Sequence, residues 1–267
     1  MTRSAALAVS PPGRILMAAV SGVGALGLLW PFLVAAHGAT SSTAPLVLTM
    51  LTAVVVGLCG VELTRGTMDA RGIAVLGILA ACGTALRIPS PGVAGIEPVF
   101  FLLVLAGRVF GPGFGFSLGG ITLLTSALVT GGVGPWLPFQ MLAAGWVGLG
   151  AGLLPRAEGG REVGLLAGYA ALACVAYGTV MNLWFWPTVA GSSTSISYVP
   201  GAGPLENLAH FVAFDLTTSM GFDLPRAMVN AMLIVVVGRP ILVALRRAAK
   251  RTRLIAAPPD LEVAEAS

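Results

Sequence analysis

Long hydrophobic runs alternate along the chain with short polar connections. Eight runs are long enough to be membrane segments, and their approximate bounds are 15–36, 45–62, 72–88, 97–110, 114–131, 137–154, 163–187 and 224–245. A helix crosses a bilayer with about 20 apolar residues. The runs at 72–88 and 97–110 are shorter, so we expect them to be tilted, kinked or only partly inserted. The pattern predicts an all-α membrane protein with about eight transmembrane helices.

Composition agrees with this reading and excludes an ordinary soluble domain. Hydrophobic residues make up 56% of the chain and charged residues only 10%, against about 25% charged residues in soluble domains. The first run follows Arg3 and Arg14, as in a signal peptide, but it extends to about 22 residues and exceeds the core of such a peptide. We therefore expect a retained transmembrane helix.

Positive charges predict the orientation in the membrane. With the N-terminus inside, most basic residues fall on the cytoplasmic side, and only Arg87 and Arg226 fall near the outer side. The run that follows the last apolar segment is then a cytoplasmic anchor facing anionic lipid rather than a nucleic-acid site; it contains Arg246, Arg247, Lys250, Arg251 and Arg253. We expect a protein of the cytoplasmic membrane with both termini in the cytoplasm.

The connection from Pro187 to Asp223 lies on the outer side in this topology and contains no Lys or Arg. Its sequence LENLAHFVAFDLTTSMGF is too polar for a comfortable span, so we expect a helix lying at the outer surface. The distribution of turns and of polar groups within the predicted segments divides the chain into an N-terminal helix pair (1–65), a six-helix core (66–250) and a cytoplasmic tail (251–267).

The residues Gly77, Ala81 and Ala85 form a stripe of small side chains spaced by four, which places them on one face of a helix. Such a stripe lets another helix approach closely. The partner is either another helix of this chain or a separate membrane subunit, and the sequence leaves both possibilities open.

Polar and aromatic side chains gather at the outer ends of the predicted helices, and they are candidates for a small-molecule site. They are Arg87, Glu97, Trp136, Gln140, Asn182, Trp186 and Asn230. Simpler explanations exist for some: Arg87 and Glu97 would form a salt bridge across an outer turn, and Trp136 suits an interfacial belt. Gln140 and Asn230 carry amides that need partners inside a membrane.

The sequence contains no P-loop, HExxH or CxxC motif, and its three cysteines have no metal-like spacing. We therefore expect neither an enzyme nor a bound metal or cofactor. A chain without a nucleotide-binding motif also cannot power active transport from its own ATP hydrolysis.

Two stretches resemble the substrate-specific S component of energy-coupling factor (ECF) vitamin transporters. The first runs from Ala74 to Pro155 and includes LAACGTALRIP and, as its most specific part, GPWLPFQM; the second is FDLPRAMVNAMLIVVVGRPILVALRR. The GPW-containing segment is most similar to S components assigned to cobalamin and related corrinoids. The N-terminal residues 1–65 depart from the family, because they add two spans before the core.

The resemblance implies a six-helix module whose outer helix ends and loops enclose a micronutrient. It implies two kinds of partner, a transmembrane coupling subunit and two cytoplasmic ATPases, and it places Gly77, Ala81 and Ala85 at the contact with the coupling subunit. The alternatives are a stand-alone secondary transporter or channel, and a membrane scaffold without transport activity.

Overall fold

The computed structural model describes residues 11–33, 70–89, 93–188 and 195–253, and these residues form helices without a strand. The helices are α1 (Pro11–Leu33), α3 (Ala70–Arg87), α4 (Val99–Phe110), α5 (Pro112–Thr130), α6 (Leu137–Leu153), α7 (Gly159–Phe185), α8 (Pro204–Thr218) and α9 (Met220–Arg253). Two short 3-10 turns lie at Val93–Gly95 and Trp186–Thr188. The all-α prediction is confirmed.

Most of the predicted membrane segments correspond to helices. Within the described residues, five helices are long and apolar enough to cross a membrane: Gly13–Leu33, Ala70–Arg87, Pro112–Thr130, Gly159–Thr188 and Met220–Lys250. The helices α4 and α6 are apolar but shorter. The predicted segment 45–62 and nearly all of the tail 251–267 lie outside the described residues.

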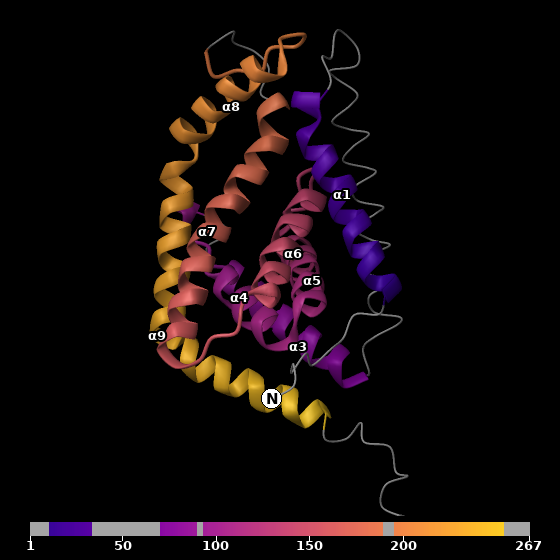
Figure 1. Cartoon of the computed structure of the whole chain (residues 1–267), viewed down its shortest axis with the longest axis vertical. Helices are drawn as coiled ribbons and strands as arrows, with labels where there is room; N and C mark the ends of the chain where they lie inside the picture. Colours follow the sequence, from indigo (N-terminus) through magenta and orange to yellow (C-terminus); the bar gives the residue numbers. More distant parts are fainter. Residues whose placement is uncertain (1–10, 34–69, 90–92, 189–194, 254–267) are drawn as a thin grey trace, which may run out of the picture.

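The short helix α4 forms the centre of the bundle (Figure 1). Eleven of its twelve residues are buried, and Leu103, Val104 and Leu105 have no exposed surface. A helix of this length extends about 18 Å at 1.5 Å per residue, less than the roughly 30 Å of a bilayer core. It is tolerated there because α5, α6, α7 and α9 surround it and cover its apolar side chains.

Glycines bring α5 and α6 into backbone contact. A Cβ atom on Gly115 would overlap the carbonyl of Gly148, and one on Gly119 would overlap the carbonyl of Ala144. Small residues at a helix interface let backbones approach closely, which is the usual way in which membrane helices gain packing energy. The many glycines of the sequence therefore have a structural role in this helix pair.

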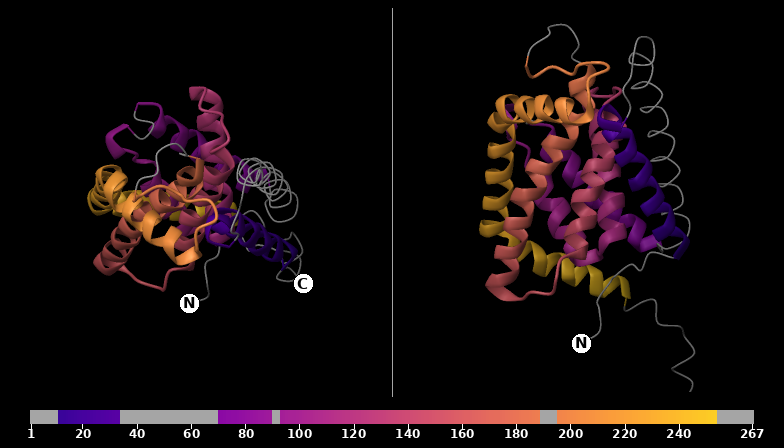
Figure 2. Two further views of the ribbon diagram at one scale, coloured as in Figure 1. Left: turned by 90° about the horizontal axis from the view of Figure 1, so that it is seen from above. Right: turned by 45° about the horizontal axis from the view of Figure 1, so that its top comes forward.

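The helix α8 crosses the end of the bundle instead of running along it, as Figure 2 shows. Its buried face contains Asn207, Phe211 and Asp215. A neighbouring stripe of exposed apolar residues consists of Leu205, Leu208, Val212 and Leu216. A helix with an apolar stripe and polar flanks suits the membrane interface. This structure agrees with the surface helix expected from the sequence.

The helix α9 is longer than predicted, because it continues past residue 245 to Arg253. Its last part turns and runs beneath the bundle (Figure 1), and Pro240 inside the helix is the kind of residue that causes such a bend. Leu242, Leu245 and Ala249 pack against the core, while Arg247 and Lys250 are exposed. The part after Pro240 is therefore amphipathic, which the hydropathy pattern alone did not distinguish from a span.

Ion pairs between charged side chains hold this last part of α9 against the bundle. The carboxylate of Glu162 accepts hydrogen bonds from Arg108 (2.8 Å) and from Arg246 (2.6 and 2.8 Å). Arg108 also donates to the carbonyls of Leu154 and Pro155, both at 3.0 Å. The connection between α6 and α7 and the end of α9 are thereby held together at the end of the bundle opposite α8.

The helix α1 packs along α6 and, at its far end, meets α8 and the loop before it. Trp146 Nε1 donates to Ser21 Oγ at 2.9 Å, and Val20 packs with Phe116 and Leu142. At this end of α1 lies an aromatic cluster made of Trp30, Phe32, Trp186, Tyr198 and Phe211. Its ring pairs have centroids 5.4–6.0 Å apart. The cluster connects α1 to α8 and to the loop before it.

This contact predicts that α1 stabilises α8. Replacing both Trp30 and Phe32 with alanine removes three of the ring pairs, and each pair is worth about 0.5–1.5 kcal/mol beyond its burial. Amide hydrogen exchange across 204–218 should become roughly tenfold faster or more, while exchange in α4 stays unchanged. The matched control replaces the exposed Leu26 and Leu33 of the same helix. Equal exchange of α8 in both variants would show that α1 does not support it.

Candidate functional site

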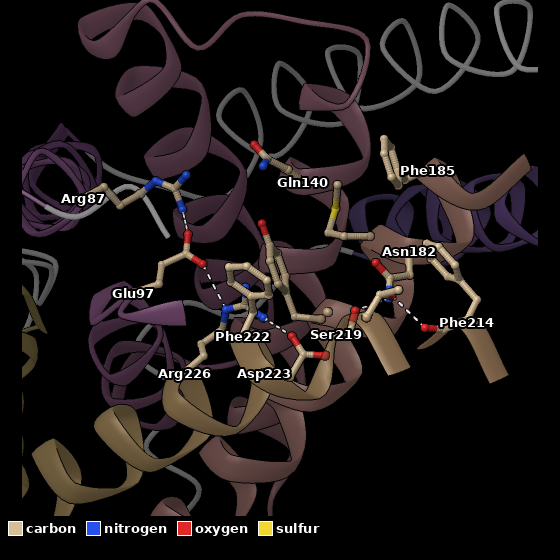
Figure 3. Close-up of a pocket in the computed structure, with 14 residues that line it drawn as sticks. Arg87, Glu97, Gln140, Asn182, Phe185, Phe214, Ser219, Phe222, Asp223 and Arg226 are labelled. Atoms are coloured by element: carbon tan, nitrogen blue, oxygen red, sulfur yellow. Dashed lines mark hydrogen bonds and ion pairs between the residues drawn. The ribbon is translucent and has the colours of Figure 1, made fainter. Parts of the chain in front are cut away.

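A cavity of about 460 Å³ lies between α3, α6, α7 and α9, with α8 contributing part of its wall. Its lining combines a few charged and amide groups with aromatic side chains (Figure 3). The lining residues are Arg87, Glu97, Gln140, Tyr177, Gly178, Met181, Asn182, Phe185, Phe214, Thr218, Ser219, Phe222, Asp223 and Arg226. The volume falls within the range of roughly 300–1,000 Å³ that is usual for small-molecule pockets.

Four buried charged residues form a continuous network along one side of this cavity. One carboxylate oxygen of Glu97 forms an ion pair with Arg87. The other oxygen accepts a hydrogen bond of 3.1 Å from Arg226 Nε. Arg226 Nη1 donates to Asp223 Oδ1 at 2.5 Å. All four side chains are at most 11% exposed. Two guanidinium groups and two carboxylates alternate, so the formal charges cancel, as buried charges require.

The salt bridge expected between Arg87 and Glu97 is therefore present, and both residues also line the cavity. The two interpretations offered by the sequence are compatible with each other. A second donor of Arg87, Nε, binds Ser126 Oγ of α5 at 3.1 Å. The network thus connects α3, α5, the start of α4 and α9.

The position of Glu97 is set by the turn before α4 and by Asn230. In that turn Gly95 has a φ of 76°, a conformation that favours glycine. A Cβ atom there would also overlap the carbonyl of Phe222. Asn230 donates to the carbonyls of Glu97 (2.9 Å) and Arg226 (2.8 Å), and its oxygen accepts from the N–H of Phe101 at 2.7 Å. Asn230 therefore ties the first turn of α4 to α9.

A glycine lets α7 and α9 meet beside the network. The carboxylate of Asp223 lies against Gly178, where any Cβ atom would overlap it. The neighbouring residue Tyr177 places its ring 5.3 Å from the guanidinium carbon of Arg226, a cation–π contact. The Tyr177 hydroxyl and Asp223 Oδ2 are buried, and neither has a hydrogen-bond partner among the residues that the structure describes.

A second polar group connects α7 with α8 at the other end of the cavity. Asn182 donates to Asp215 Oδ1 at 2.6 Å and to the hydroxyl of Ser219. Thr179 donates to Asp215 Oδ2 at 3.1 Å. These bonds fix the C-terminal part of α8 beside the cavity, so the position of its Phe214 and Thr218 depends on them.

The structure brings four of the seven predicted site residues to this cavity: Arg87, Glu97, Gln140 and Asn182. Trp136 lines a smaller adjacent cavity of about 160 Å³, which Arg87 and Gln140 also border. Trp186 and Asn230 line neither cavity. Trp186 belongs to the aromatic cluster with α1, and Asn230 lies behind the network and positions it.

The sequence-based selection omitted five polar residues that the structure places in the lining: Tyr177, Thr218, Ser219, Asp223 and Arg226. A signal for two of them was available, because Asp223 and Arg226 are opposite charges three residues apart at the start of an apolar helix. Ionisable residues in membrane segments usually have a function. Tyr177 gave no such signal, since it stands in an apolar run like any packing residue.

The small-residue stripe lies on the outer surface of α3. Gly77, Ala81 and Ala85 are all exposed, and nothing approaches within 4 Å of the place where a Cβ atom of Gly77 would stand. The opposite face of α3 packs against α5, where Gly83 meets Thr122. Among the described residues the stripe therefore does not serve internal packing.

A model of the ECF transporter substrate-specific component matches residues 71–238. The match covers more than half of the chain and extends from the start of α3 into α9. The chain belongs to this family. S components are substrate-binding subunits of a transporter, not enzymes, and they work with a transmembrane coupling component and ATPases. Searches of curated proteins and of solved structures found no match.

The matched region of this S component contains the whole buried network and leaves α1 outside. With its several apolar helices, the chain is a multi-pass membrane protein.

The network predicts that Glu97 is required for stability. Replacing Glu97 with glutamine leaves Arg87 and Arg226 without the carboxylate that they share. Removing one partner of a buried ion pair costs about 3–5 kcal/mol, so the thermal unfolding midpoint in detergent should fall clearly. The control is Glu158→Gln, which changes an exposed carboxylate in the connection between α6 and α7. Equal midpoints for both variants would contradict the structural role of Glu97.

Proposed function

We propose that this S component binds a vitamin or related micronutrient in the 460 Å³ cavity beside α8 and delivers it as part of an ECF-type importer. The observation that carries the proposal is a pocket whose wall combines fixed charged and amide groups with aromatic side chains, within a chain of a substrate-binding family. Such a composition is typical of small-molecule sites. Family membership favours a transporter subunit over the stand-alone transporter or channel.

Within the proposed site the residues have different roles. Arg87, Glu97, Gln140 and Asn182 present polar groups to the ligand. The Gln140 side chain makes no hydrogen bond within the described part of the chain, so its amide is available. Trp136 borders the adjoining space. Trp186 and Asn230 act indirectly, the first through the position of α8 and the second through the position of Glu97.

The corrinoid expected from the sequence resemblance stays a prediction, and the size of the cavity bears on it. A volume of about 460 Å³ lies in the lower half of the usual pocket range. Corrinoids are among the largest vitamins, so a corrinoid would bind only if α8 moved away from the bundle. The hydrogen bonds of Asp215 to Asn182 and Thr179 oppose that movement.

We further propose that the exposed stripe of Gly77, Ala81 and Ala85 contacts the transmembrane coupling subunit. Its small side chains are turned away from the bundle, and a smooth helix face lets a second helix approach closely. On the cytoplasmic side two ATPases would supply the energy, because the chain itself has no nucleotide-binding motif.

The test is assembly and uptake with the partner subunits. Co-expressed with the coupling subunit and ATPases of its own organism, the chain should co-purify with them and support ATP-dependent vitamin uptake. The Ala81→Trp variant should lose most of its co-purification and most of its uptake, because the indole prevents a helix of the coupling subunit from approaching α3 closely. The control is Leu172→Trp on the exposed face of α7, and the unfolding midpoints should match. Normal assembly and uptake with Ala81→Trp would remove the stripe from the coupling contact.

The orientation in the membrane is part of the proposal. Arg108, Arg156, Arg161 and Arg246 belong to the end of the bundle opposite α8, which the positive-inside rule assigns to the cytoplasm. Both termini are then cytoplasmic.

Cysteine labelling checks this orientation. In a background without the three native cysteines, a cysteine at the exposed Thr217 of α8 should react with a membrane-impermeant maleimide in intact cells. A cysteine at the exposed Glu158 should react only after permeabilisation. The reverse pattern would invert the proposed topology.

A further inference from the structure

We infer that the cavity selects an uncharged or cationic ligand, built on a flat ring that carries an N–H donor for Asp223 and Tyr177. This inference rests on the proposed function, since it assumes that the cavity is the ligand site. It adds the chemical class of the ligand.

Two unpartnered polar atoms give the first argument. Asp223 Oδ2 and the Tyr177 hydroxyl belong to side chains of the lining that are only 2% and 4% exposed as residues. Neither atom has a hydrogen-bond partner among the described residues, although Asp223 Oδ1 is bound by Arg226. A buried acceptor without a donor is unfavourable. Both atoms have almost no accessible surface, so a ligand donor reaches them by displacing the side chains that cover them. Its hydrogen bond then removes that penalty, because the Asp223 carboxylate can only accept.

The charges of the lining give the second argument. The guanidinium groups of Arg87 and Arg226 are already paired with Glu97 and Asp223. An anionic ligand would have to compete with these carboxylates for the positive charge of either guanidinium. Asp215, which does not line the cavity itself, adds a further negative charge behind Asn182, and its carboxylate is bound by the neutral donors of Asn182 and Thr179. The local charge therefore disfavours a ligand carboxylate and tolerates a cation.

The remaining wall gives the third argument. Phe185, Phe214 and Phe222 line the cavity together with Met181 (Figure 3). Aromatic rings pack well against another flat ring, and their faces also attract cations. A volume of about 460 Å³ accommodates one such ring system with its substituents. These walls favour a heterocycle over an extended flexible chain.

A purely structural explanation makes a different prediction. If Asp223 only neutralises Arg226, and Tyr177 only stacks on it, their free atoms have no part in binding. Changing those atoms would then alter stability without altering which ligand binds. The experiment therefore measures ligand preference and unfolding in the same samples.

The experiment is a titration of the purified full-length chain in detergent with probes that differ in one group. Nicotinamide and nicotinate share a ring and differ in an amide against a carboxylate. Thiamine and oxythiamine differ in an amino group against an oxo group. Biotin, pantothenate and cyanocobalamin complete the set. We expect binding of at least one amino- or amide-bearing ring, at least tenfold tighter than its matched analogue.

Two variants connect that preference to the proposed atoms. Asp223→Asn should weaken the bound ring at least tenfold. Tyr177→Phe keeps the aromatic ring beside Arg226 and removes only the hydroxyl, so it should weaken binding about three- to tenfold with little change in the unfolding midpoint. The second variant keeps the test decisive if the first does not fold.

Several results would overturn the inference. They are tighter binding of a carboxylate vitamin or cyanocobalamin than of every amino- or amide-bearing ring, binding of no probe, or unchanged affinity in Tyr177→Phe and in any folded Asp223→Asn sample. Each leaves the proposed function standing if the chain still assembles with its partners and supports uptake. Failure of assembly would instead remove the proposed function itself.

Discussion

The alternating ion network of Arg87, Glu97, Arg226 and Asp223 is the constraint on which the half of the bundle nearest α8 depends. In a membrane protein an isolated charge is expensive to bury, so each of these residues requires its neighbours. Arg87 comes from α3, Glu97 from the turn before α4, and the other two from α9. Satisfying the charges therefore fixes where three elements meet, and the cavity lies beside that meeting point.

Features that look unrelated in the sequence follow from this constraint. Gly178 has no side chain because the Asp223 carboxylate occupies that space, and Gly95 has none because the Phe222 carbonyl does. Asn230 is fully buried, and its side chain hydrogen-bonds to the backbone of Glu97 and Phe101 around the start of α4 and to the backbone of Arg226 in α9. Substituting any of these residues would disturb the charges indirectly. Polar contacts and packing are thus parts of one arrangement, because buried polar groups are costly unless they find partners.

The sequence predicted the fold well because apolar length and turn residues are local signals. It placed α3 to α7 within a few residues and anticipated a surface helix near α8. It ended the last membrane segment at about residue 245, whereas α9 continues to Arg253 with an amphipathic part after Pro240. The site was harder to predict. Glu97 and Arg226 are 129 residues apart, and no local pattern shows that they meet.

Aromatic residues also show that a local sequence pattern does not reveal which residues meet in the fold. Trp186 directly follows the last residue of α7, where a tryptophan suits either a ligand site or the membrane interface. Its ring instead packs against Phe32 and Tyr198, and its N–H donates to the carbonyl of Ile196 at 2.7 Å. One of these packing partners, Phe32, belongs to α1, which lies outside the matched family region. The role of Trp186 therefore depends on a helix that the family pattern does not include.

The contact between α1 and α8 bears on how the cavity opens. The helix α8 is held at its C-terminal end by Asp215 and at its middle by Phe211. The first attachment is polar and lies beside the cavity, so a ligand that competes for Asn182 would weaken it. The second is apolar, lies farther along α8 and involves α1, so such a ligand would leave it intact. Such a ligand would therefore loosen the C-terminal end of α8 first, while the contacts of Phe211 with Trp186 and with Phe32 of α1 hold its middle.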